Sequence, residues 1–265
     1  MTAFWGIIEK ELKVAFTTPV AYIVFLMFSV VSGGFFLLYL QGYELAVQRA
    51  RHFDDDQLYA QLNFTDLILT PMFAGVLFIL LIAVPLLTMR SFAEERQQRS
   101  IELLLTSPVT SAQVVLAKFV ALLVVVGCIT AQLIVYPATL NHFGTTSMAG
   151  ASVIDWSTTL LSMMGVFLAG GLCASIGMCI SSLTNSQIQA AISTFGVLVL
   201  LWSLNGISGQ IPGWLGDVAR FLSPPAHFTN FNRGLLDLGD MVYFVGGTGF
   251  FLFFASRVFE GQRWA

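Results

Sequence analysis

The amino-acid sequence predicts an all-α membrane protein with six transmembrane helices. Of its 265 residues, 56% are hydrophobic and only 10% are charged, and the mean hydropathy is +0.80. A soluble domain carries about 25% charged residues, because its surface must be hydrated. Six stretches with almost no Asp, Glu, Lys or Arg come close to the roughly 20 apolar residues that a spanning helix needs. The whole chain, residues 1–265, is therefore expected to form a single membrane domain.

The predicted spans alternate with polar segments. Residues 156–216 contain no charged side chain, so two spans share this stretch, with a polar turn at residues 181–189 between them. Eight of the 12 Lys and Arg residues fall on one side of the predicted membrane and four on the other. Because positive charges collect in cytoplasmic loops, both termini are expected in the cytoplasm. The predicted spans are residues 19–40, 67–89, 113–136, 156–181, 188–205 and 241–256.

Residues 1–18 are predicted to form an amphipathic elbow helix that lies along the membrane surface before the first span. Glu9 and Lys13 are four residues apart and are expected to pair on its polar face, where Lys10 also lies. The alternative is a frayed N-terminal tail. Charged residues precede a full-length span here, so the segment is not expected to be a signal peptide. The predicted apolar face consists of Phe4, Ile7, Ile8, Leu12, Ala15 and Phe16.

Few ionisable groups are expected at membrane depth. Lys118 lies about one turn inside the third span, where a lysine can extend its ammonium group back to the interface. Proton-coupled carriers and ion pumps usually depend on ionisable groups within their spans. The spans therefore offer no obvious proton relay, and any energy source is expected outside these helices.

The cytoplasmic segment 90–112 is the most informative part of the chain. It begins with the charged residues Glu94, Glu95 and Arg96. Pro108 ends the helix predicted there, and Thr110 and Gln113 have the spacing of a capping box for the third span. Leucines exposed to cytosol need a partner or a membrane to cover them, although packing on the bundle itself is an alternative. The apolar strip and its single acid are Ile101, Glu102, Leu103, Leu104 and Leu105.

Two further patterns concern packing. Small residues recur every four positions in the fourth span, which allows close helix approach within one subunit or, as an alternative, at a dimer contact. Residues 206–240 are expected to form one or two short helices at or dipping into the outer leaflet, broken by Pro224 and Pro225. Their aromatic side chains are expected in an interfacial belt: Trp214, Phe221, Phe228 and Phe231. The small residues of the fourth span, every four positions, are Gly165, Ala169, Cys173, Gly177 and Ser181.

Enzymatic functions find little support. The segment around Ser208 resembles the serine motif of rhomboid intramembrane proteases, but the last span has no histidine, and His227 lies in an outer segment. The histidines do not have metal-ligand spacing, so no metal site is expected. No lysine follows a glycine, which excludes a Walker A loop, so any ATP must bind to a partner. A net charge of −3 gives no footprint for nucleic acid.

Two motifs resemble those of a known family. Residues 95–108 read Glu-x-x-x-Arg-Ser-Ile-Glu-x-Leu-Leu-Thr-x-Pro, and this is similar to the coupling motif of type 2 ABC exporter permeases, except that Arg99-Ser100 replaces the usual Gly-Thr. Residues 222–234, with Asp240, Tyr243 and Phe244, are similar to a second motif of that family. Together with the closing Gln262-Arg263-Trp264, they resemble the gliding-motility-type branch.

The resemblance implies a permease subunit in the inner membrane of a bacterium. Its partners would be a cytoplasmic ABC ATPase dimer, a second permease copy or homologue, and in some members a periplasmic or membrane accessory protein. ATP and Mg would bind to the ATPase, with no cofactor on this chain. Export and force transmission both stay open, and a non-transport scaffold is the alternative. The coupling helix would contact the ATPase through Glu94, Glu95, Arg96, Ile101, Glu102, Leu103, Leu104, Leu105 and Pro108.

Overall fold

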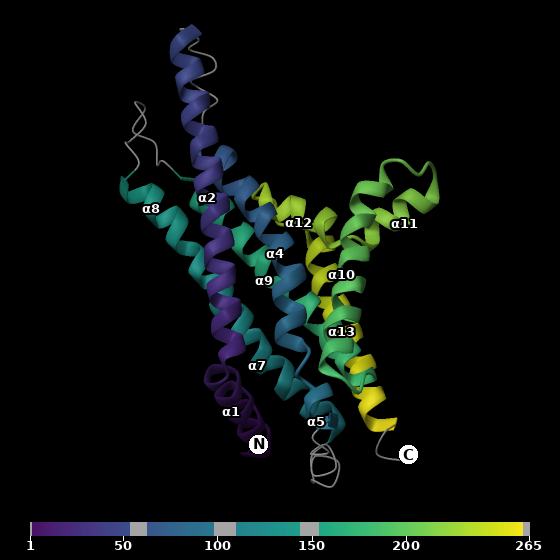
Figure 1. Ribbon diagram of the computed structural model, residues 1–265. Helices are drawn as coiled ribbons and strands as arrows, with labels where there is room; N and C mark the ends of the chain where they lie inside the picture. The colour runs from purple at the N-terminus through teal and green to yellow at the C-terminus, as the bar shows by residue number, and fades with distance from the viewer. Residues whose placement is uncertain (1, 54–62, 98–109, 144–153, 262–265) are drawn as a thin grey trace.

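The computed structural model describes residues 2–53, 63–97, 110–143 and 154–261 (Figure 1). These residues form helices and short connections, with no strand among them. Six helical segments are long and apolar enough to cross a membrane, which confirms the predicted number of spans. Both termini lie at the same end of the bundle, called here the terminal end (Figure 1).

The helices are longer than the predicted spans. The first spanning helix continues to Phe53, well past the predicted end at residue 40, and rises beyond its neighbours at the opposite end (Figure 1). A π-helical turn, η1 (Thr65–Leu69), precedes the second, and a 3-10 turn, η2 (Gln132–Ile134), interrupts the third. The remaining elements are α1 (Thr2–Thr17), α2 (Pro19–Phe53), α4 (Thr70–Thr88), α5 (Ala93–Gln97), α7 (Ser111–Ala131), α8 (Val135–Phe143), α9 (Trp156–Leu183), α10 (Gln187–Ser208), α11 (Trp214–Leu222), α12 (Pro224–Asn232) and α13 (Leu238–Gly261).

Local capping fixes where two spans begin. The Thr110 hydroxyl accepts a hydrogen bond from the Gln113 backbone at 3.4 Å, and the Gln113 side chain accepts one from the Thr110 backbone at 3.2 Å. This confirms the predicted capping box at the start of α7. Asp155 caps α9, because its carboxylate accepts from the Thr158 hydroxyl at 2.6 Å and from the Ser157 backbone at 3.0 Å. The Thr158 hydroxyl and these backbone groups lower the pKa of Asp155.

Helix α9 is the centre of the bundle and packs against α4, α7, α12 and α13. Its glycines allow close approach: a Cβ added to Gly165 would lie 2.8 Å from the Phe231 Cβ, and one added to Gly177 would lie 2.8 Å from the Thr88 Cβ. Neither position has room for a larger side chain. The small-residue stripe therefore packs within this chain, as one of the two sequence interpretations expected.

Two short helices follow α10, as predicted, but they differ in environment. On α11, Trp214 is 72% exposed and Phe221 is also exposed, which fits the expected interfacial position. Phe228 and Phe231 on α12 are instead buried, so their assignment to an aromatic belt is wrong. Their spacing of three residues puts both rings on one helical face, and that face meets Gly165 of α9.

Candidate functional site

The candidate site lies at the terminal end, where α1, α5 and α7 meet. Helix α5 directly precedes the segment predicted to contact an ATPase, so its attachments decide how that segment is connected to the spans. Of the predicted coupling residues, the structure describes only Glu94, Glu95 and Arg96. The others lie outside the described residues: Ile101, Glu102, Leu103, Leu104, Leu105 and Pro108.

A buried lysine joins the three helices. Lys118 of α7 is 3% exposed, and its Nζ donates to Glu11 of α1 at 2.8 Å and to Glu95 of α5 at 2.9 Å. The ammonium also lies 5.4 Å from the centre of the Phe92 ring. This lysine was predicted to extend its ammonium group to the interface; it is buried within the protein, because α1 packs along α7 and brings a carboxylate to it.

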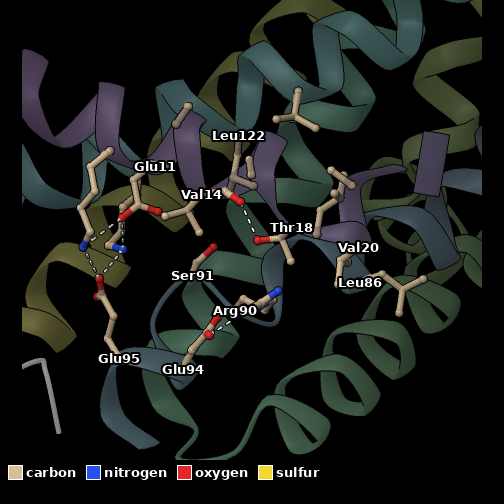
Figure 2. Close-up of a pocket in the computed structure, with 17 residues that line it drawn as sticks. Glu11, Val14, Thr18, Val20, Leu86, Arg90, Ser91, Glu94, Glu95 and Leu122 are labelled. Carbon is tan, nitrogen blue, oxygen red and sulfur yellow. Dashed lines mark hydrogen bonds and ion pairs between the residues drawn. The ribbon is translucent and has the colours of Figure 1, made fainter. Parts of the chain in front are cut away.

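A fourth charge completes the group. Lys10 of α1 lies 3.5 Å from the Glu95 carboxylate and 3.9 Å from that of Glu11, with its own side chain 60% exposed. Figure 2 shows the two carboxylates directed toward the same pair of nitrogens. We call Lys10, Glu11, Glu95 and Lys118 the terminal charge cluster; its two cations and two carboxylates have no net formal charge. A buried charge is costly unless it is paired, and here each buried charge is paired across helices.

Helix α5 is also attached to α9 and α10. The Ser181 hydroxyl of α9 accepts hydrogen bonds from the backbone of Phe92 and Ala93, each at 3.1 Å, at the start of α5. Arg96 donates to the Asn185 side chain at 3.1 Å and to the Ser182 carbonyl. Within its own segment, Glu94 forms a two-point ion pair with Arg90, with N–O distances of 2.6 and 2.7 Å. Every charged side chain of α5 therefore has a partner within this chain.

These contacts place the predicted residues more precisely. Glu94, Glu95 and Arg96 were expected around a contact with the ATPase; each makes its described polar contacts within this chain. Sequence reasoning missed Glu11, Ser181 and Asn185 as parts of this site. One signal was available for Glu11: it follows Ile8 by three residues and precedes Ala15 by four, so all three share the packed face of α1.

The predicted elbow residues divide as a helix with one packed face should. Ile8 is buried, while Phe4, Ile7 and Leu12 are half-buried. Glu9 and Lys13 form the predicted pair on the exposed face, with an N–O distance of 2.6 Å. The hydrogen bond from Lys13 lowers the pKa of Glu9. The segment is helical, as predicted, and its position along the membrane surface stays a prediction.

A second polar cluster at the opposite end was also missed. His227 of α12 contacts the Asp240 carboxylate of α13 through Nδ1 at 2.6 Å and the Phe221 carbonyl through Nε2 at 2.9 Å. The Tyr243 ring stacks on the imidazole with centroids 3.9 Å apart. His227, Asp240 and Tyr243 belong to the second family motif, whose spacing was a signal for the cluster, and Phe221 directly precedes that motif.

This geometry does not support a serine protease. Both ring nitrogens of His227 face acceptor oxygens, so the ring has no free nitrogen to act as a base. The Ser208 hydroxyl donates to the Asn205 carbonyl at 2.9 Å. Among the described residues, no group of three or more His, Cys, Asp or Glu side chains could hold a metal ion.

Comparison with known proteins identifies the family. The model of the family described as "ABC-2 family transporter protein" matches residues 5–259. The chain is also 30% identical over 155 residues to the "Probable multidrug ABC transporter permease YbhR" of Escherichia coli strain K12, and a match of the same identity is found in strain O157:H7. The match covers 57% of this chain and 39% of the relative, so the chain matches well under half the length of that protein. The gliding-motility branch stays a prediction. Because the family model spans nearly the whole chain, this multi-pass membrane protein belongs to the ABC-2 family of transporter proteins.

Proposed function

We propose that this chain is the permease subunit of an ABC transporter, and that a separate cytoplasmic ATPase dimer drives it through the segment after α5. The observation that carries the proposal is the attachment of α5, which is held by Lys118 of α7, Ser181 of α9 and Asn185 beside α10. The family membership and the permease relatives agree with this role.

The attachments suggest how movement would pass into the membrane. Closure of the ATPase pair on ATP would displace residues 98–109, and α5 is continuous with them. A short helix held to three elements cannot shift alone, so its displacement would carry α1, α7 and the end of α9 with it. The chain itself would supply no catalytic group, since ATP and Mg bind to the partner.

The remaining assignments follow from this role. The terminal end would face the cytoplasm, in agreement with the distribution of Lys and Arg, and the membrane would be the inner membrane of a bacterium. A second copy of this chain, or a homologous permease, would complete the transporter. Export of a substrate and transmission of force to a periplasmic or membrane accessory protein are both compatible with this coupled movement of α5 and the helices attached to it.

The experiment measures ATPase association with charge- and shape-changing variants of the predicted coupling helix. Glu102→Lys and Leu104→Asp are each expected to weaken binding by about 1–3 kcal/mol, the range of an interface anchor. Glu260→Lys is the matched control, because Glu260 is half-exposed at the same end on α13. Co-purification and ATPase stimulation are compared at equal membrane expression. Parental values for both coupling variants would refute the proposal and favour a scaffold.

A further inference from the structure

A cavity of about 270 Å³ lies beneath the elbow helix, between α1, the start of α2, the end of α4, α5 and α7. Figure 2 shows its polar side, where the terminal charge cluster and the Arg90–Glu94 pair lie at separate places on the wall, with Ser91 between them. Its other side is apolar and includes Val14, Leu86 and Leu122. A cavity with one charged wall and one apolar wall fits an amphiphile.

The charges on the wall select among amphiphiles. Three cations, Lys10, Arg90 and Lys118, stand against three carboxylates, Glu11, Glu94 and Glu95, so the lining has no net formal charge. A headgroup with a net charge would find no excess of opposite charge to compensate its loss of hydration. A zwitterionic headgroup would find both signs within one cavity.

Donors remain available for the negative half of such a headgroup. Arg90 carries five N–H donors, and its ion pair with Glu94 uses two of them. Lys10 is largely exposed and carries three donors. An arginine fork is well matched to phosphate oxygens, and a lysine adds a point charge. For the positive half, the carboxylates accept hydrogen bonds, so an ammonium with N–H donors fits better than a quaternary one.

The size and surroundings of the cavity indicate how a lipid would lie. Its volume is slightly below the roughly 300–1,000 Å³ of sites that enclose a whole drug-sized ligand. It therefore suits a headgroup, with the acyl chains outside. Val14 lines the cavity and is 44% exposed, and the side chains of Tyr22 and Ile23 beyond it on α2 are exposed. Acyl chains leaving the cavity on this side would meet an apolar surface.

We propose that the cavity binds the headgroup of a zwitterionic phospholipid with a primary ammonium, phosphatidylethanolamine being the matching chemistry. The phosphate contacts Arg90 and Lys10, and the ammonium contacts the carboxylates of Glu11 and Glu94. The lipid fixes the elbow helix to the bundle from the membrane side, as the terminal charge cluster does from the polar side. The site does not depend on the ATPase proposed above, so each idea can fail without the other.

The test is native mass spectrometry of the delipidated protein titrated with phosphatidylethanolamine, phosphatidylcholine or phosphatidylglycerol of equal acyl chains. Phosphatidylethanolamine is expected to bind saturably and at least about tenfold more tightly than phosphatidylglycerol, with phosphatidylcholine between them. Ala121→Phe fills the cavity from α7 and should reduce this binding about tenfold or more. Val124→Phe is the control, because Val124 lies on the same helix, is 41% exposed and does not line the cavity.

Ala121 is buried, so a second variant protects the test from misfolding. Val14→Trp narrows the cavity from the exposed elbow helix and should give the same loss while the protein keeps its melting temperature. Equal affinity for the anionic lipid, or parental binding in the Val14→Trp variant, would overturn the proposal. Competition by soluble phosphoethanolamine at the same concentration would also overturn it, since the site would then accept a soluble metabolite without a membrane anchor.

Discussion

Replacing Lys118 with methionine tests whether the terminal charge cluster holds α1 in place. The substitution keeps an unbranched apolar stem and removes the ammonium. Glu11 and Glu95 then lose the charge that both contact, at 2.8 and 2.9 Å. Lys10 is the only other cation of the cluster, and it lies farther from both carboxylates, at 3.9 and 3.5 Å.

The structure sets the expected magnitude. Removing one partner of a buried ion pair costs about 3–5 kcal/mol, because a charge is left buried without compensation. With Lys118 at 3% exposure, the Lys118→Met variant is expected in this range. The matched variant Lys10→Met removes a cation whose side chain is 60% exposed, so it should cost only about 0–1 kcal/mol. The two lysines face the same two carboxylates, and burial and distance distinguish them.

Reversible unfolding in mixed micelles, followed by tryptophan fluorescence, measures both values. A triple variant, Lys118→Met with Glu11→Gln and Glu95→Gln, removes the uncompensated carboxylates as well. It should recover at least about 1 kcal/mol relative to Lys118→Met, since neutral groups replace the whole buried set. The reasoning is refuted if Lys118→Met costs no more than Lys10→Met, or if the triple variant is the least stable of the three.

Three further predictions concern other parts of the chain. Gly165→Val should destabilise the bundle by about 1–3 kcal/mol, because the added methyl groups would clash with Phe231, and this should appear as a lower melting temperature. The same substitution at Gly196, where no atom lies close, should have little effect. Asp155→Ala should cost about 0.5–2 kcal/mol through loss of the α9 cap. Because the pKa of Asp155 is lowered in the folded protein, its carboxylate contributes stability above its ordinary pKa of 3.8, and this contribution is lost as the pH falls through the folded pKa. In a pH series, Asp155→Ala should therefore lose less stability on acidification than the parent protein. Asp240→Asn should loosen the contact with His227 and speed proteolysis between α11 and α12. An unchanged cleavage rate would show that the His227–Asp240 pair does not hold α11 and α12 in place.

Hydropathy was sufficient to predict the number of spans, because a bilayer requires long apolar helices whatever they pack against. Capping chemistry is equally local, and the Thr110–Gln113 box was confirmed for that reason. The side-chain environments were harder to predict. Phe228 and Phe231 look like interfacial aromatics until Gly165, more than 60 residues away in the sequence, provides the space that buries them.

The candidate site shows the same division between local and long-range information. The charged run at the start of residues 90–112 was recognised, but the partners of its members lie far along the chain: Glu95 contacts Lys118, and Arg96 contacts Asn185. A charge run by itself does not tell whether its side chains face a partner protein or their own bundle. The presence of one lysine in an otherwise uncharged span was the strongest available signal, because such a charge needs a counter-charge.

The two proposals meet at the same side chains. Glu11, Glu94 and Glu95 line the cavity, and two of them also bind Lys118, so a displacement of α5 would change the cavity wall. Linkage is reciprocal: if moving α5 alters the affinity for a headgroup by some factor, the bound headgroup alters the equilibrium of α5 by the same factor. A phospholipid in this cavity would therefore shift the conformational equilibrium of α5 directly. The lipid composition of the membrane would then influence the position of the coupling segment through α1, which would also anchor the chain.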